Sequence, residues 1–211
     1  MKLHIFGTCG GSEPMPGRRH VSFAVDHHDR LYWFDAGESA SYTAHLMGVD
    51  LMRTRAVFIS HTHMDHIGGL GNLFWTLRKL DGMHHNLRYR DVDLYIPEIG
   101  AWDAILGMLR YTEGAFDCDF RIRAREYGDG ILLEEDGLRV TALHNRHLPP
   151  RADGAWRSFG FSIGSDGEKV VFSGDTGGVE DLYPLLDDCG LLLMETGHHA
   201  PVDVARTLLK A

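Results

Sequence analysis

Four side chains able to bind a metal ion lie within six residues of this 211-residue chain. They are His61, His63, Asp65 and His66, and they directly follow the apolar run of residues 56–59. On an extended segment the first three share one face, and the turn at His66 brings the fourth round. Imidazole suits zinc, iron and similar cations, while a nearby carboxylate can hold a second ion or orient a water. The spacing therefore indicates a metal site at the end of a buried strand, rather than a solvated histidine-rich loop.

Three further segments place polar groups after apolar runs. Residues 140–147 end in two histidines, His144 and His147, either of which could complete a metal site. The run of residues 170–173 leads into a Gly-Asp turn at Asp175, and residues 195–199 read Glu-Thr-Gly-His-His. A Gly-Asp turn is weak evidence by itself. Paired with the first cluster, it indicates a carboxylate able to bridge two cations.

Two segments near the amino terminus offer supporting roles. The glycine-rich bend of residues 7–12 could form a phosphate nest after the first strand. Residues 34–38, Phe-Asp-Ala-Gly-Glu, place Asp35 after another apolar run. Asp35 could orient a ligand histidine, as metal sites commonly require, or cap a helix that begins near Glu38.

The elements that must position these residues alternate along the chain. Short apolar runs predict strands, and longer patterns between them predict helices, which together argue for sheets covered by helices. The expected strands are Leu3–Phe6, Val21–Val25, Leu31–Phe34, Ala56–Ser60, Val92–Ile96, Leu138–Leu143, Phe159–Ile163, Lys169–Ser173 and Leu191–Met194. The expected helices are Glu38–Met47, Leu70–Leu80, Glu98–Leu109, Val179–Leu186 and Val202–Lys210. The charged segment Arg78–Arg90 is expected to form an exposed loop.

Bulk properties restrict the class of protein. The length predicts a single domain over residues 1–211. No apolar stretch approaches the roughly 18 residues of a membrane span, and the first apolar run is too short for a secretory signal. Three widely spaced cysteines suit a reducing cytoplasm. The net charge of −9 does not suit non-specific nucleic-acid binding, although bound dications would reverse the local sign for a nucleotide.

Taken together, these motifs resemble the metallo-β-lactamase superfamily, whose signature His-x-His-x-Asp-His follows a strand. The resemblance covers nearly the whole chain and implies an α/β fold, a four-layer αββα sandwich with metals where strand ends meet. The glycine-rich bend resembles the ribonuclease Z-like and phosphodiesterase branch, in which such a loop lines the active-site rim. The superfamily also includes β-lactamases, thioester hydrolases and lactonases, so fold alone does not settle the substrate.

The resemblance also implies two divalent metal ions, expected to be zinc, with manganese or iron as alternatives. The spacing of the family favours His147 over His144 as the third ligand of the first ion. The ligands implied are His61, His63 and His147 for the first ion, Asp65 and His66 for the second, and Asp175 as the bridge.

Two residues would then carry the chemistry. Asp65 would orient a water whose pKa the cations lower from about 15.7 toward 7. His198 matches a histidine that assists proton transfer to the leaving group in ribonuclease Z. Its alternative role is a pH-sensitive surface cap, and His199 is expected to be a neighbour rather than a participant.

One departure from the family pattern concerns the second ion. Family members usually carry a last ligand histidine on a strand after the helix that begins here at Val202, whereas this sequence ends at Ala211. Either the sequence is a fragment or a natural short form, or another residue takes over, with His199 as a candidate. We therefore expect the second metal site to be weak.

The sequence thus predicts a cytoplasmic metal-dependent hydrolase that acts on a small-molecule or nucleotide-type phosphodiester. A transfer-RNA nuclease is less expected because no long basic Gly/Pro-rich arm is evident. The alternatives are a thioester, lactone or lactam hydrolase of the same fold, or a non-catalytic metal- or ligand-binding protein. No membrane partner is expected, and self-association into a homo-oligomer is left open.

Overall fold

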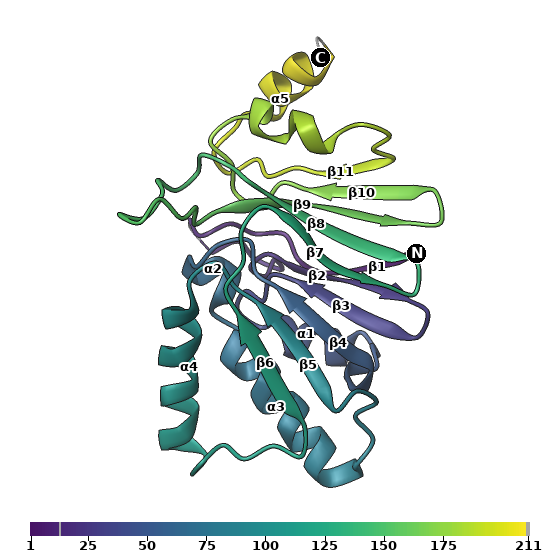
Figure 1. The fold of residues 1–211 in the computed structure, drawn as a ribbon, viewed down its shortest axis with the longest axis vertical. Coiled ribbons are helices and arrows are strands. Elements are labelled where there is room, and N and C mark those ends of the chain that lie inside the picture. Colours follow the sequence, from purple (N-terminus) through teal and green to yellow (C-terminus); the bar gives the residue numbers. More distant parts are fainter. Residues whose placement is uncertain (13, 210–211) are drawn as a thin grey trace. The chain divides into compact units, whose positions relative to one another are not determined.

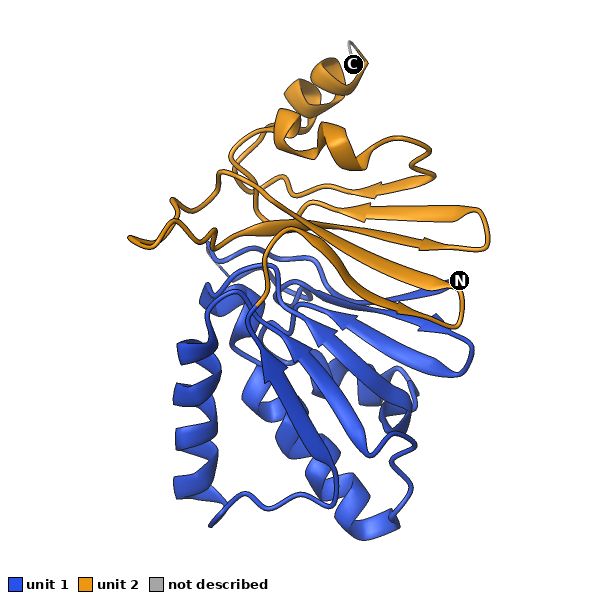
Figure 2. Ribbon diagram, in the orientation of Figure 1, with its two compact units in different colours: residues 1–126 blue, residues 127–211 orange. Residues whose placement is uncertain are grey.

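The computed structural model describes residues 1–12 and 14–209. The chain divides into two compact units, unit 1 (residues 1–126) and unit 2 (residues 127–211), shown in Figure 2. Each unit contains one β-sheet and its own helices (Figure 1). Within the described ranges, no helix has the length and apolar character needed to cross a membrane.

Unit 1 is built on a six-stranded sheet whose strands lie in sequence order, β1 to β6. The first three strands are antiparallel, and β3 to β6 run parallel. Parallel neighbours need crossover connections, which the helices supply. The elements are β1 (Lys2–Gly7), β2 (Ser22–His27), β3 (Arg30–Phe34), α1 (Ala40–Leu46), η1 (Leu51–Arg53), β4 (Thr54–Phe58), α2 (Met64–Ile67), α3 (Leu70–His84), β5 (Asp91–Tyr95), α4 (Ile99–Thr112) and β6 (Arg121–Arg125).

Alternating side chains give the sheet of unit 1 two different faces. One face packs against the helices, where Val57, Leu94, Leu70 and Phe74 are fully buried in a single core. The other face carries a row of stacked aromatic rings across four neighbouring strands. Their centroids are separated by 5.0 Å (Phe23–Phe34), 5.0 Å (Phe34–Phe58) and 4.8 Å (Phe58–Tyr95). Because β3 and β4 are parallel and paired, the residues that follow each of them emerge side by side.

Unit 2 is built on a five-stranded sheet with the order β11-β10-β9-β8-β7. Among the residues of unit 2 that the structure describes, only β10 and β11 pair in parallel, and a 3₁₀ helix, η2, makes the crossover between them. Gly160 permits close packing there, since a Cβ on it would lie 3.1 Å from Leu182 Cδ2 on η2. The elements are β7 (Gly130–Glu135), β8 (Leu138–His144), β9 (Phe159–Ser165), β10 (Glu168–Phe172), η2 (Val179–Leu185), β11 (Leu191–Leu193) and α5 (Pro201–Leu208).

All nine predicted strands are present, each within about two residues of its expected bounds. The predicted loop Arg78–Arg90 is wrong at its start, because α3 continues to His84. Leu77 and Asp81 on this part of the helix are buried. The Asp81 carboxylate accepts a hydrogen bond from Leu87 N at 2.9 Å and pairs with Arg90 at 2.8 Å. The burial of these residues and the pairing of Asp81 stabilise the helix as far as His84, in a segment whose charged residues had suggested an exposed loop.

Two strands were missed, β6 and β7, and one helix differs in type. The β6 sequence, Arg-Ile-Arg-Ala-Arg, alternates between charged and apolar residues and so contains no apolar run. In the structure, Arg121, Arg123 and Arg125 pair with Asp91 and Asp93 on the adjacent strand β5. The expected helix Val179–Leu186 is the 3₁₀ helix η2, which contains a proline. The last helix ends at Leu208, and the predicted end at residue 210 lies outside the described residues.

Candidate functional site

The four predicted metal-binding residues of unit 1 come together after β4. The ring centroid of His61 lies 4.6 Å from that of His63 and 4.0 Å from that of His66. Asp65 Oδ2 lies 3.3 Å from His66 Nε2. His61, His66 and Asp65 are buried. The backbone leaves the strand in an extended conformation at His63 and turns into the short helix α2, which brings the fourth side chain round. We call these four residues the unit 1 cluster.

Asp35, which follows the neighbouring strand β3, supports the unit 1 cluster through contacts with Ser60 and His66. Its Oδ1 accepts a hydrogen bond from Ser60 N at 2.7 Å, and its Oδ2 accepts one from Ser60 Oγ at 2.8 Å. Asp35 Oδ2 also lies 2.7 Å from His66 Nδ1, which leaves Nε2 directed at Asp65. The orienting role expected for Asp35 therefore fits this geometry. The alternative helix-cap role does not, because Ser39 occupies the N-cap position of α1.

Ser60 was not identified from the sequence. Besides its two bonds to Asp35, its hydroxyl lies 3.1 Å from His61 Nδ1 and 3.3 Å from His66 Nδ1. A serine after a strand is too common to be a signal, so only the fold shows that it joins two imidazoles to one carboxylate.

The glycine-rich bend after β1 lies against Asp65. A Cβ on Gly11 would lie 2.9 Å from Asp65 Oδ1 and 3.1 Å from Oδ2, so a larger residue there would force this carboxylate to shift. Burial by itself would raise the pKa of Asp65, but the hydrogen bond and charge of His66 hold that pKa below its usual range. The carboxylate is therefore ionised at neutral pH, as metal binding requires.

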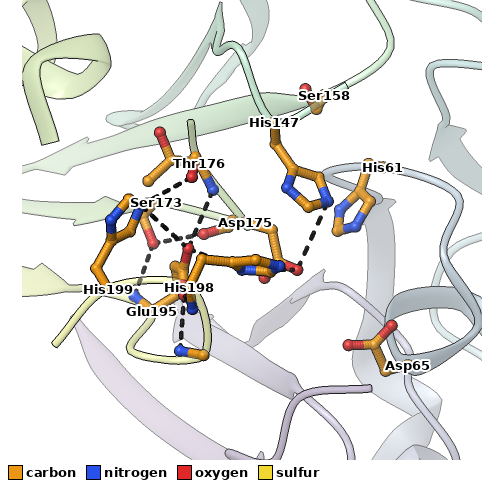
Figure 3. Close-up of polar contacts among 12 residues, drawn as sticks. His61, Asp65, His147, Ser158, Ser173, Asp175, Thr176, Glu195, His198 and His199 are labelled. Carbon is orange, nitrogen blue, oxygen red and sulfur yellow. Dashed lines mark hydrogen bonds and ion pairs between the residues drawn. The ribbon is translucent and has the colours of Figure 1, made fainter. Parts of the chain in front are cut away.

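In unit 2, three predicted site residues converge at the ends of the strands (Figure 3). Asp175 follows β10, and its Oδ2 lies 3.8 Å from His147 Nε2 and 3.8 Å from His198 Nδ1. The two imidazole rings meet edge to face with centroids 4.9 Å apart. Asn145 ties this region together, since its amide donates to Asp175 O at 2.8 Å and its Oδ1 accepts from His147 N at 3.1 Å. We call Asp175, His147 and His198 the unit 2 cluster.

Glu195 is the principal residue whose role the sequence did not reveal. Its Oε2 accepts hydrogen bonds from Gly197 N at 2.8 Å and His198 N at 2.9 Å. Its Oε1 lies 3.1 Å from His198 Nδ1 (Figure 3). Each of Asp175, Glu195 and His198 offers a ligand atom within 4.8 Å of the others. A signal existed, because Glu195 follows a strand in the same way as Asp175.

The two remaining histidines of unit 2 have other partners. His144 Nδ1 lies 2.7 Å from Asp129 Oδ2, and its ring stacks on Trp156 with centroids 4.2 Å apart. His199 Nε2 lies 2.9 Å from Thr176 O. Within unit 2, His147 rather than His144 therefore stands beside Asp175, and His199 is a neighbour of the cluster.

The donor atoms of both clusters suit a divalent transition metal. Imidazole nitrogens and carboxylate oxygens are ligands of zinc, manganese and iron. A carboxylate bonded to the far nitrogen of a ligand histidine, as Asp35 is to His66, is typical support for such a ligand. Since Ser60 and Asp35 engage the Nδ1 side of His66, Nε2 is the atom that would face a cation.

Comparison with known proteins shows the family. Residues 32–207 match a family model described as the Beta-lactamase superfamily domain. Because this match spans most of the chain, the chain belongs to the metallo-β-lactamase superfamily. The predicted family and fold are confirmed, and membership implies binding of divalent metal.

Curated relatives include ribonuclease Z from two organisms. That of Methanothermobacter thermautotrophicus is 29% identical over 147 residues, which cover 70% of this chain and 45% of the relative. That of Picrophilus torridus is 32% identical over 146 residues, which cover 69% and 44%. The chain thus spans less than half the length of these relatives.

Two solved structures share the fold at low identity. The short form of human tRNase Z matches with a TM-score of 0.73 at 22% identity, covering 91% of this chain and 76% of that one. The metallo-β-lactamase fold protein YhfI from Bacillus subtilis matches with a TM-score of 0.57 at 18% identity, covering 82% and 61%. At this level of identity both comparisons concern the fold alone.

Proposed function

We propose that this member of the metallo-β-lactamase superfamily is a metal-dependent phosphodiesterase that acts on a nucleotide-type or RNA phosphodiester. The observation that carries the proposal is His198, held by Glu195 at 3.1 Å and lying 3.8 Å from Asp175. This arrangement supplies a positioned proton donor beside a metal-binding carboxylate, which cleavage of an ester with a poor leaving group requires. The ribonuclease Z relatives support the choice of a phosphodiester over other esters.

The proposed ligand set draws on both clusters, so we propose that the two units work as a single hydrolase domain. Imidazole and carboxylate chemistry favours two zinc ions, with manganese or iron as substitutes. The proposed ligands are His61, His63 and His147 for the first ion, Asp65 and His66 for the second, and Asp175 for both. The three widely spaced cysteines support a reducing compartment, the cytoplasm.

The residues of the chain have separate tasks in the proposed reaction. Bound divalent ions lower the pKa of water toward about 7 and stabilise negative charge on phosphoryl oxygens. The Asp65 carboxylate accepts a hydrogen bond from the attacking water and so directs the lone pair of the water oxygen at phosphorus. The new P–O bond forms as the bond to the leaving oxygen breaks, and His198 Nε2 gives that oxygen its proton. Glu195 positions the imidazole by engaging Nδ1.

Turnover of bis(p-nitrophenyl) phosphate with added zinc or manganese tests the proposal directly. We expect hydrolysis that chelator abolishes and added metal restores. Hydrolysis of a thioester, lactone or lactam without any phosphodiesterase activity would instead place the chain in that class. Purified protein that contains no metal and is indifferent to chelator would contradict a metal-dependent activity altogether.

A matched pair of variants tests the ligand assignment. His147→Ala should lower the metal content of the purified protein, because His147 lies beside Asp175. His144→Ala should leave it unchanged, since its ring stacks on Trp156 and its Nδ1 is engaged by Asp129. Greater metal loss from the second variant would show that the wrong histidine was assigned.

A further inference from the structure

The loop between β8 and β9, residues 145–158, is closed at its base by three hydrogen bonds. Asn145 N donates to Ser158 O at 2.9 Å, Ser158 Oγ donates to Asn145 O at 3.2 Å, and Leu148 N donates to Ser158 Oγ at 3.1 Å. Beyond this base, the loop projects from the sheet of unit 2 (Figure 2). His147 and Trp156 therefore lie on opposite limbs of one loop, each within two residues of the closed base.

Trp156 has a fixed ring partner, His144. The two rings are nearly parallel, with an interplanar angle of 12° and centroids 4.2 Å apart. His144 is itself held at two points by Asp129, whose Oδ1 accepts from His144 N at 2.6 Å and whose Oδ2 lies 2.7 Å from Nδ1. This double attachment sets the plane of the imidazole and, through the stack, the plane of the indole.

Packing of the core does not require this stack. The core aromatics of unit 2, Phe159 and Phe161, are at most 1% exposed, whereas Trp156 and His144 are only partly buried. Across residues 1–12 and 14–209, His144 is the single aromatic ring in contact with Trp156. A large planar side chain is thus held in a defined orientation on a projecting loop, with ring contact on one side alone.

The position of the stack relates it to the proposed metal ligands. His144 precedes His147 by three residues, a separation of at most about 10 Å along the chain. A phosphate held by His147 and Asp175 would therefore be bound next to the base of the loop that carries Trp156. Flat aromatic side chains bind nucleobases by stacking, which tolerates any base because every base has a π-face.

We propose that Trp156, held by His144 and Asp129, is a stacking platform for the base of a nucleotide substrate. This inference rests on the proposed function and narrows its substrate class. The preferred phosphodiesters carry a nucleobase next to the scissile phosphate, and simple alkyl phosphodiesters are poor substrates.

Calorimetric titration of the metal-supplemented full chain with adenosine 5′-monophosphate and with ribose 5-phosphate tests the platform without turnover. We expect the nucleotide to bind about tenfold more tightly, an effect of the size that base stacking supplies. Trp156→Ala should remove this preference, and Trp156→Phe should keep most of it. The matched control is Trp75→Ala, a partly exposed tryptophan on α3 of unit 1, which should leave both affinities unchanged. Thermal unfolding of each variant separates a lost platform from a lost fold.

The outcomes distinguish this inference from the function on which it rests. Equal affinity for the two ligands, no measurable binding of either, or a preference that survives in Trp156→Ala would overturn the platform. Hydrolysis of bis(p-nitrophenyl) phosphate together with equal affinities would keep the phosphodiesterase and reject the platform. A preference for the nucleotide that depends on Trp156, without hydrolysis of any phosphodiester, would support the platform and reject the proposed activity.

Discussion

The two clusters of potential metal ligands are built in different ways. In unit 1, His61, His63, Asp65 and His66 come from one stretch of six residues after β4, and Asp35 on the adjacent strand end supports them. In unit 2, the cluster is assembled from three separate segments that follow β8, β10 and β11. The unit 1 cluster is therefore formed by one local segment of the backbone, whereas the unit 2 cluster is formed by three loops that are distant in sequence.

The two clusters also differ in how far their side chains are exposed, which bears on the roles proposed for them. In the unit 1 cluster, His61, Asp65 and His66 are buried, and the fully buried carboxylate of Asp35 fixes the orientation of His66. In unit 2, the side chain of His198 is 49% exposed and depends on Glu195 for its orientation. Loops held by a rigid scaffold often carry the groups that meet the substrate. In the proposed reaction, the unit 1 cluster would hold metal and water, and His198 of unit 2 would meet the leaving group.

The largest expected effect is the loss of Asp65. Asp65→Ala should lower kcat on bis(p-nitrophenyl) phosphate by about 10²-fold or more, because a positioned acid–base group is removed. Asp65→Asn keeps the shape of the side chain beside Gly11 but removes its charge, so its kcat should fall nearly as much. Initial rates at saturating metal check this, and near-normal turnover in either variant would remove Asp65 from the mechanism.

His198→Ala should have an effect that depends on the leaving group. A phosphodiester that releases an alcohol needs a proton at the departing oxygen, so its kcat should fall by about 10²-fold with little change in KM. Release of p-nitrophenolate needs no proton, so that substrate should be affected much less. An equal loss on both substrates would show that His198 has a structural or ligand role instead.

Glu195→Gln should retain more activity than Glu195→Ala, since it keeps a hydrogen-bonding partner for the loop.

Asp35→Asn tests the rigidity of the unit 1 cluster. Asparagine tolerates the positive φ of 54° at this position but presents no charged oxygen to His66 Nδ1. Loss of such a supporting carboxylate typically weakens metal affinity by about 10- to 100-fold. Competition with a fluorescent chelator measures this change. The matched control, Asp93→Asn, alters another buried carboxylate of unit 1 and should leave metal affinity as it is.

Asp93→Asn should instead lower stability by about 2 kcal/mol at pH 7, the scale of hydrogen bonds to a charged group. Asp93 accepts bonds from Arg55 at 2.5 Å, Arg123 at 2.8 Å and Arg125 at 2.6 Å. Burial by itself would raise the pKa of Asp93, but these arginines hold it below its usual range.

A lowered folded-state pKa gives Asp93 a definite pH dependence. Its stabilising contribution is complete above the unfolded pKa of about 3.9 and is lost as pH falls through the lower folded pKa. Urea unfolding of wild type and Asp93→Asn should therefore differ most at neutral pH and converge in acid. A difference that grows as pH falls would contradict this account.

The same contrast explains which features could be predicted from sequence. The unit 1 cluster lies in consecutive residues after an apolar strand, so its spacing was enough to propose it. Nine strands were predicted because their apolar runs are distinct. The segment Arg78–His84 was predicted as a loop because its charged residues suggested solvent, whereas Asp81 pairs with Arg90 in the fold. The strand β6 has no apolar run, and its arginines pair with carboxylates on β5, as Arg123 does with Asp93.

The sequence by itself determined the family, the order of most strands, and the ligand types at the strand ends, because local spacing and hydrophobic runs carry that information. Only the tertiary structure showed that His147 lies beside Asp175 while His144 stacks on Trp156. It also paired Asp35 with His66 rather than with a helix end, and placed Glu195 beside His198. Each of these placements arises because strands that are distant in sequence end at neighbouring positions in a sheet. Hydrogen bonds and burial then select one orientation for each side chain. The spacing of residues along the chain does not contain these tertiary contacts, so it cannot predict which orientation is selected.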